Sequence, residues 1–89
     1  IAQGLSAAIW QKIDFVNGRV LQGNFDTFPF IRMHQTPEIE VAVIDSDASP
    51  TGVGEPGLPT VAPALAGAIF DATGTRLRSM PFRDALKGA

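Results

Sequence analysis

The sequence has no cysteine among its 89 residues. That absence excludes disulfide bonds, thiolate nucleophiles, cysteine-ligated zinc and iron–sulfur clusters held by this chain alone. Charge is scarce and nearly balanced, with seven Lys and Arg residues, nine Asp and Glu residues and a net charge of −2. Electrostatics therefore gives no reason to expect nucleic acid or an anionic membrane as a partner.

The sequence also lacks an unbroken apolar run. Prolines and glycines interrupt the longest uncharged stretches, residues 48–54 and 56–70, so we expect no membrane-spanning helix. The chain begins with Ile1 rather than Met, and its opening residues read as the interior of an element. We therefore expect a processed chain or a part of a larger one.

The length suits a single domain, residues 1–89, with a small core. A domain of this size buries only about 60–65% of the surface that its unfolded chain exposes, so its stability is marginal. The hydrophobic fraction of 45% is typical of a globular chain rather than a disordered one.

A β-hairpin is the clearest local pattern. Apolar residues alternate on both sides of Asn17-Gly18. Asn-Gly is the preferred pair for a two-residue type I′ turn, because both central residues need positive φ. We predict a hairpin over residues 12–25. Its predicted pairs are Phe15 opposite Val20 and Val16 opposite Arg19.

Two segments have helical patterns. A partial apolar face predicts a short N-terminal helix over residues 4–11. A second helix is predicted over residues 61–73, with Thr60 as its N-cap, Pro63 in its first turn and Gly74 as the left-handed residue after its end. This second segment carries a single charged residue, so we expect a buried helix.

Two further segments have strand patterns. Apolar and polar residues alternate over most of residues 38–45, which predicts a strand with one buried face. Residues 75–80 are predicted as an edge strand. With the hairpin, these strands form a small mixed or antiparallel sheet, and the order helix, hairpin, strand, helix, strand indicates the α+β class.

Most polar residues have a structural explanation. His34 is the only histidine, so with no cysteine a metal site would need carboxylates alone, and we expect a solvated loop residue. Asp45 and Asp47 lack a glycine at the offset that a calcium-binding EF-hand loop requires. Glu38 and Glu40 fit the solvated face of a strand. We therefore predict no metal ligands in this chain.

Glu55 differs from these residues because of its neighbours in the motif GVGEP. Gly52 and Gly54 permit another body to approach the backbone closely, and Pro56 favours an extended conformation at Glu55. If this region packs into a larger body, the carboxylate is poorly solvated and gains affinity for a proton, which suits a general base. The residues alone favour a plain loop glutamate over a general base.

The stretch GVGEPGLPTVAPALAGAIFDATGTRLRSMPF resembles the carboxyl-terminal end of the large, molybdopterin-binding subunit of the xanthine dehydrogenase and aldehyde oxidase family. Within that family the chain is similar to the isoquinoline 1-oxidoreductase beta-subunit type, which also includes bacterial membrane-associated aldehyde dehydrogenases. The resemblance extends to AQGLSAAIWQKIDFVNGRVLQGNFDTFPFIRMHQTPEIEVAVID and so covers almost the whole chain.

The resemblance implies that Glu55 is a general base beside the molybdenum of an enzyme that oxidises an N-heterocycle or an aldehyde with oxygen from water. Val53 and Gly54 would lie against the molybdopterin cytosine dinucleotide, and Gln3 would hydrogen-bond the pterin. The implied partners are the remainder of the large subunit and a small [2Fe-2S] subunit. We expect the isolated chain to be inactive and to bind no cofactor.

Several properties stay open at this stage. The sequence does not decide the substrate, although Phe28 and Phe30 are candidates for its walls, nor the compartment, periplasm or cytoplasm. A competing hypothesis is a non-catalytic interaction module that docks through the apolar segment 61–73 and the apolar loop 25–33. A dimer in which the helix packs against its own copy is compatible with either hypothesis.

Overall fold

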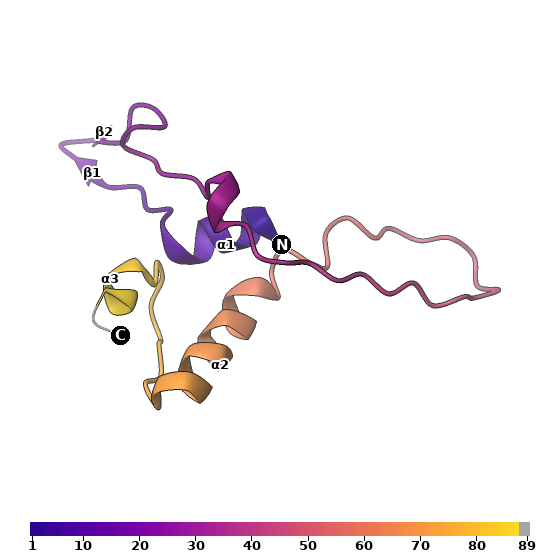
Figure 1. The fold of residues 1–89 in the computed structure, drawn as a ribbon. Coiled ribbons are helices and arrows are strands. Elements are labelled where there is room, and N and C mark those ends of the chain that lie inside the picture. Colours follow the sequence, from indigo (N-terminus) through magenta and orange to yellow (C-terminus); the bar gives the residue numbers. More distant parts are fainter. Residues whose placement is uncertain (88–89) are drawn as a thin grey trace.

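The computed structural model describes residues 1–87 and contains three helices, one 3-10 turn and one two-stranded antiparallel hairpin (Figure 1). In chain order these are α1 (Ala2–Ile9), β1 (Phe15–Val16), β2 (Arg19–Val20), η1 (Met33–Gln35), α2 (Val61–Thr73) and α3 (Arg83–Leu86). The α+β class predicted from the sequence is confirmed. Within the described part of the chain, no helix is long and apolar enough to cross a membrane.

Helix α1 lies at the centre of the structure because its small side chains let other segments pack closely around it. Gly4, Ser6 and Ala8 are its buried residues. The N–H of Phe82 donates to the carbonyl oxygen of Ala8 at 2.8 Å, and Phe82 is only 4% exposed. This contact fastens the segment before α3 to α1. The helix begins two residues before the predicted range of 4–11.

The hairpin has the predicted register. Phe15 pairs with Val20, and Val16 pairs with Arg19. Asn17 and Gly18 have φ values of 49° and 76°, as a type I′ turn requires. The predicted hairpin over residues 12–25 is confirmed, with a paired region shorter than that range.

Side chains extend the hairpin beyond its paired strands. The N–H of Asp14 donates to the Gln22 Oε1 atom at 2.8 Å, and the Gln22 amide donates to the Asp14 carboxylate at 3.1 Å. The Lys12 Nζ atom lies 3.0 Å from the same carboxylate. The hydrogen bond from Lys12, followed by that from Gln22, holds the pKa of Asp14 below its usual value.

Helix α2 occupies the predicted range 61–73 and ends as predicted. Gly74 is left-handed, with φ of 75°, and its N–H donates to the carbonyl oxygen of Phe70 at 2.7 Å. The expected burial is wrong, because Val61 is the one buried residue of α2. Helix α1 packs near the N-terminal end of α2 (Figure 1). Among the described elements, no other helix or strand packs as extensively against α2.

Thr60 is at the predicted N-cap position of α2, but the expected capping hydrogen bond is absent. The Thr60 hydroxyl instead donates to the carbonyl oxygens of Pro56 and Gly57, at 3.1 and 3.2 Å. The hydroxyl therefore stabilises the turn before the helix rather than the helix end.

The two additional strands predicted from the sequence do not form. Residues 38–45 belong to no strand, and Val41, Val43 and Ile44 are 80–88% exposed. The alternating pattern is real, but no neighbouring strand is present to pair with it. Residues 75–80 are not a strand because they turn back onto α2, where the Arg76 guanidinium lies 3.7 Å from the centre of the Phe70 ring.

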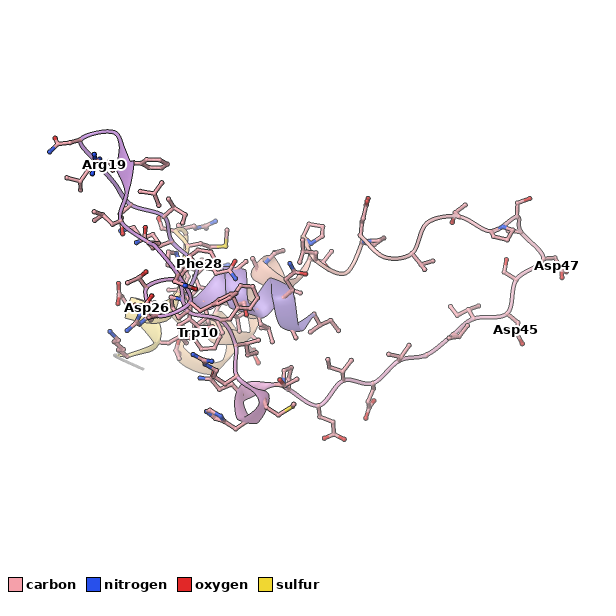
Figure 2. The ribbon with its side chains drawn as sticks, turned by 90° about the horizontal axis from the view of Figure 1, so that it is seen from above. Trp10, Arg19, Asp26, Phe28, Asp45 and Asp47 are labelled. Carbon is pink, nitrogen blue, oxygen red and sulfur yellow. The ribbon has the colours of Figure 1, made fainter. Side chains whose placement is uncertain are left out.

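The overall shape is elongated. Residues 37–56, here called the arm, run out from the body and return to it (Figure 1). Asp45 and Asp47 lie at the far end of the arm (Figure 2). The radius of gyration is 16.3 Å, against about 12 Å for a compact domain of this length. The fold therefore leaves much of its apolar surface uncovered.

Candidate functional site

Glu55 lies at the base of the arm, where the chain returns to the body. It lines a pocket of about 520 Å³ with Gly52, Gly54, Pro56 and Pro59. A Cβ atom built on Gly52 or Gly54 would meet no atom within 4 Å. The pocket is therefore open at both glycines, and Glu55 itself is exposed.

Short-range hydrogen bonds hold the backbone that carries Glu55. The N–H of Leu58 donates to the carbonyl oxygen of Glu55 at 3.1 Å, and the N–H of Val61 donates to that of Leu58 at 3.4 Å. We call residues 55–60 the Glu55 turn. These bonds connect Glu55 to the first residue of α2.

Helix α1 approaches the Glu55 turn at Gly4. A Cβ atom built on Gly4 would lie 2.8 Å from Val61 Cγ2, 2.9 Å from Val61 Cβ and 3.1 Å from the Leu58 carbonyl oxygen. Ordinary contact begins at 3.4 Å, so only glycine fits here without a shift. Gly4 is not among the site residues predicted from the sequence, although a glycine within a helical pattern is a known signal of close packing.

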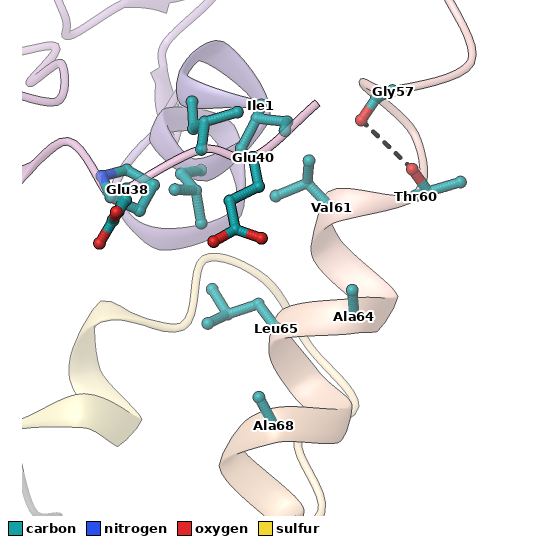
Figure 3. A pocket seen from close by; sticks show the side chains of 12 residues that line it. Ile1, Glu38, Glu40, Gly57, Thr60, Val61, Ala64, Leu65 and Ala68 are labelled. Carbon is teal, nitrogen blue, oxygen red and sulfur yellow. Dashed lines mark hydrogen bonds between the residues drawn. The ribbon is translucent and has the colours of Figure 1, made fainter. Parts of the chain in front are cut away.

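The outgoing end of the arm, the Glu55 turn, α1 and α2 border one apolar groove of about 560 Å³ (Figure 3). Leu5 of α1 and Leu65 of α2 lie on its walls, and Ile39 reaches it from the outgoing end of the arm. Glu40 also lines the groove, with its side chain directed toward α2 (Figure 3). The groove shows that the arm leaves and rejoins the body at nearly the same place.

The four predicted site residues fall into two groups. Val53, Gly54 and Glu55 follow one another on the returning side of the arm, whereas Gln3 lies on α1 next to Gly4. All four predicted residues are exposed. Gly4, the residue after Gln3, contacts the Glu55 turn at Leu58, three residues after Glu55. Their roles as base and as cofactor contacts stay predictions.

The other candidate residues are not gathered at this pocket. His34 lies on η1, and Asp45 and Asp47 lie at the tip of the arm. Among residues 1–87, no group of three or more His, Cys, Asp or Glu residues is placed to hold a metal ion.

Phe28 and Phe30 belong to an aromatic cluster in the loop after the hairpin. The ring centroids of Phe25 and Phe30 are 6.1 Å apart with an interplanar angle of 80°, and those of Phe28 and Phe30 are 6.3 Å apart at 62°. These edge-to-face contacts stabilise the loop. They also leave Phe25 67% exposed, which makes this loop part of the uncovered apolar surface.

Comparison with known proteins identifies relatives of this chain. The chain is homologous, over nearly its whole length, to a short part of oxidoreductase subunits. It is 41% identical over 87 residues to the membrane-bound aldehyde dehydrogenase (pyrroloquinoline-quinone) of Gluconacetobacter polyoxogenes. It is 40% identical over 86 residues to the beta subunit of the isoquinoline 1-oxidoreductase of Brevundimonas diminuta, and 30% identical over 82 residues to a subunit of the nicotinate dehydrogenase of Pseudomonas putida.

The chain spans only a small part of these relatives. The matches cover 96%, 97% and 91% of this chain but 11%, 11% and 7% of the respective relatives. No family model matches the sequence, and no solved structure matches it. The predicted resemblance to the isoquinoline 1-oxidoreductase beta-subunit type is confirmed.

Proposed function

We propose that this chain is part of the catalytic subunit of a molybdenum hydroxylase that oxidises an N-heterocycle or an aldehyde. In this reaction a C–H bond is replaced by a C–O bond with oxygen from water, two protons are released, and two electrons pass to a small [2Fe-2S] subunit. Two relatives are named for N-heterocycles, isoquinoline and nicotinate, and one is named for aldehydes. These names support the two substrate classes.

The cofactor that we propose is molybdopterin cytosine dinucleotide, which accepts the two electrons when it is bound. The residues present fit the edge of such a site. Gly52 and Gly54 have no Cβ atom to keep a bulky group away from the backbone beside Glu55, and the pocket is open there. Val53 and Gly54 would contact the cofactor through their backbone, and Gln3 through its side-chain amide.

We assign Glu55 the role of general base. It is the one carboxylate that lines the pocket, and Pro56 stiffens the backbone next to it. One of its carboxylate oxygens would accept a proton from the attacking water as the C–O bond forms. A general base of this kind contributes about 10²–10⁴ in rate. The observation that carries the proposal is this single carboxylate, on a fixed turn in an open glycine-lined pocket, in a chain homologous to these oxidoreductase subunits.

The uncovered apolar surface supports a larger parent protein. This surface includes Val41 and Val43 on the arm, Phe25 of the aromatic cluster after the hairpin, and most of α2. An exposed apolar surface of this extent is typical of an interface with another protein segment. We propose that the remainder of the large subunit covers it and shields Glu55 from water, so that the isolated chain is inactive.

The test is Glu55→Gln in the intact parent enzyme, with Asp47→Asn at the tip of the arm as the matched control. We expect Glu55→Gln to lower turnover by about 10²–10⁴, while molybdenum and pterin content stay at the level of the unmodified enzyme. Asp47→Asn should change neither. Near-normal turnover of Glu55→Gln, or a parent enzyme without molybdenum, would contradict the proposal.

A non-catalytic docking module is the second candidate function, because the apolar groove and the loop 25–33 are open to a partner. The gene upstream of Ile1 separates the two candidates. A continuous reading frame of several hundred codons supports the enzyme, whereas a start codon directly before Ile1 supports the module.

A further inference from the structure

We propose that Gly4 is a positioning residue for Glu55. By placing no side chain between α1 and the Glu55 turn, it sets where the Glu55 backbone stands relative to α1 and to Gln3. The catalytic consequence rests on the proposed function, whereas the structural coupling between Gly4 and the turn does not.

Leu58 connects the two positions. Its carbonyl oxygen faces Gly4, at 3.1 Å from where a Cβ atom would be. Its N–H donates to the carbonyl oxygen of Glu55 at 3.1 Å. A shift of Leu58 away from α1 therefore reaches Glu55 through a single hydrogen bond.

The Glu55 turn is stiff enough to transmit such a shift. Pro56 and Pro59 fix their own φ angles and restrict the residue before each of them, which are Glu55 and Leu58. The Thr60 hydroxyl closes the turn by donating to the carbonyl oxygen of Pro56 at 3.1 Å. We expect the turn to move as a unit rather than to absorb the displacement within itself.

Helix α1 cannot easily retreat from the turn because other contacts hold it. The Ser6 hydroxyl oxygen accepts a hydrogen bond from the N–H of Ile31 at 2.8 Å. The carbonyl oxygen of Ala8 accepts one from the N–H of Phe82, also at 2.8 Å. A methyl group added at Gly4 would therefore push the Glu55 turn outward rather than move α1.

The overlap of a Cβ atom at position 4 with its neighbours sets a minimum displacement. The Cβ of an alanine at position 4 would lie 2.8 Å from Val61 Cγ2 and 3.1 Å from the Leu58 carbonyl oxygen, whereas ordinary contact begins at 3.4 Å. Val61 must therefore give way by at least about 0.6 Å and the Leu58 carbonyl by at least about 0.3 Å. A misplacement of about 1 Å at a reacting group can lower the rate by about 10²-fold. Because the displacement is a fraction of that distance, we expect Gly4→Ala to lower kcat by about 10-fold with KM nearly unchanged.

Gly67→Ala is the matched control. Gly67 also lies inside a helix, and a Cβ atom there would meet nothing within 4 Å. Both variants are made in the intact parent enzyme. Three quantities are measured for each: hydrogen exchange of the amides of residues 55–61, molybdenum and pterin content, and kcat separately from KM.

Support requires that Gly4→Ala speeds exchange at the amides of Leu58 and Val61 and lowers kcat, with cofactor content and KM close to those of the unmodified enzyme. Gly67→Ala should leave exchange at the amides of residues 55–61 unchanged. Unchanged exchange at residues 55–61 in Gly4→Ala overturns the proposal. A normal kcat despite faster exchange also overturns it, as does a loss of turnover in proportion to lost cofactor, because Gly4 would then act in assembly.

If Gly4→Ala fails to accumulate, Val61→Ala provides the test, since it loosens the same contact without a clash. It should speed exchange at Leu58 and lower kcat, and the absence of either effect contradicts the proposal. Failure of the proposed function is detected separately by an active Glu55→Gln enzyme. The exchange coupling between Gly4 and residues 55–61 does not depend on that result.

Discussion

The hydroxyl oxygen of Ser6 accepts a hydrogen bond from the backbone N–H of Ile31, 25 residues later in the chain, at 2.8 Å. Ser6 has no exposed surface, so this bond is shielded from water at its acceptor end. It ties the segment after the aromatic cluster to α1. Because α1 also contacts the Glu55 turn through Gly4, the Ser6 bond helps to fix the helix against which that turn rests.

Removal of the Ser6 hydroxyl should destabilise the fold. Ser6→Ala leaves the N–H of Ile31 without its partner, which costs about 1–3 kcal/mol. The free energy of unfolding in urea measures this loss. The control is Ser46→Ala at the tip of the arm, where the hydroxyl oxygen accepts from the exposed N–H of Ala48 at 3.1 Å. We expect a change within about 0.5 kcal/mol for Ser46→Ala, and an equal effect of the two variants would contradict the role of the buried bond.

The hairpin should weaken in acid because of Asp14. Its contacts with Lys12 and Gln22 lower the pKa of its carboxyl in the folded state. The stabilisation is therefore present above the ordinary carboxyl pKa of the unfolded chain and is lost as the pH falls through the lower folded value. The NMR signals of Asp14 and of the Leu21 amide, followed from pH 6 downward, should report this loss.

The Asp14→Asn variant should remove this acid dependence, because the asparagine side chain does not titrate. Lys12→Gln should move the transition toward higher pH, since it removes the largest cause of the lowered pKa. An identical pH dependence of the hairpin signals in all three proteins would show that Asp14 does not stabilise the hairpin.

The arm should be protected only inside the parent enzyme. Residues 38–45 belong to no strand, so we expect their amides to exchange with solvent rapidly in the isolated chain. In the parent, where we propose that another part of the subunit covers this segment, the same amides should exchange much more slowly. Hydrogen exchange measured by mass spectrometry on both samples makes the comparison. Rapid exchange in both would argue against a covered arm.

Local chemistry made the hairpin and the limits of α2 predictable. Asn17 and Gly18 favour one turn type, and that turn fixes which residues face one another across the strands. Gly74 similarly fixes the end of α2 through a conformation that other residues rarely adopt. In each case the information lies within a few residues of the feature.

Burial and strand pairing were not predictable in the same way, because they depend on distant neighbours. The apolar pattern of residues 61–73 indicates a helix with a partner, but nothing in that pattern shows whether this chain provides the partner. The alternation in residues 38–45 has the same limit. At the candidate site, the proline and glycines around Glu55 indicated a constrained carboxylate, whereas Gly4 was missed because its partners, Leu58 and Val61, lie more than fifty positions away.

The outgoing end of the arm and the Glu55 turn meet at the same groove, since Pro37 and Glu38 line it from one side and Gly57 and Thr60 from the other. The position of the Glu55 turn on the body therefore does not depend on the length of the arm. Loop-closure entropy rises slowly with length, by about 0.6 kcal/mol for each doubling. Insertions or deletions near Asp47 should accordingly be tolerated, so that the tip can diversify while the carboxylate keeps its place.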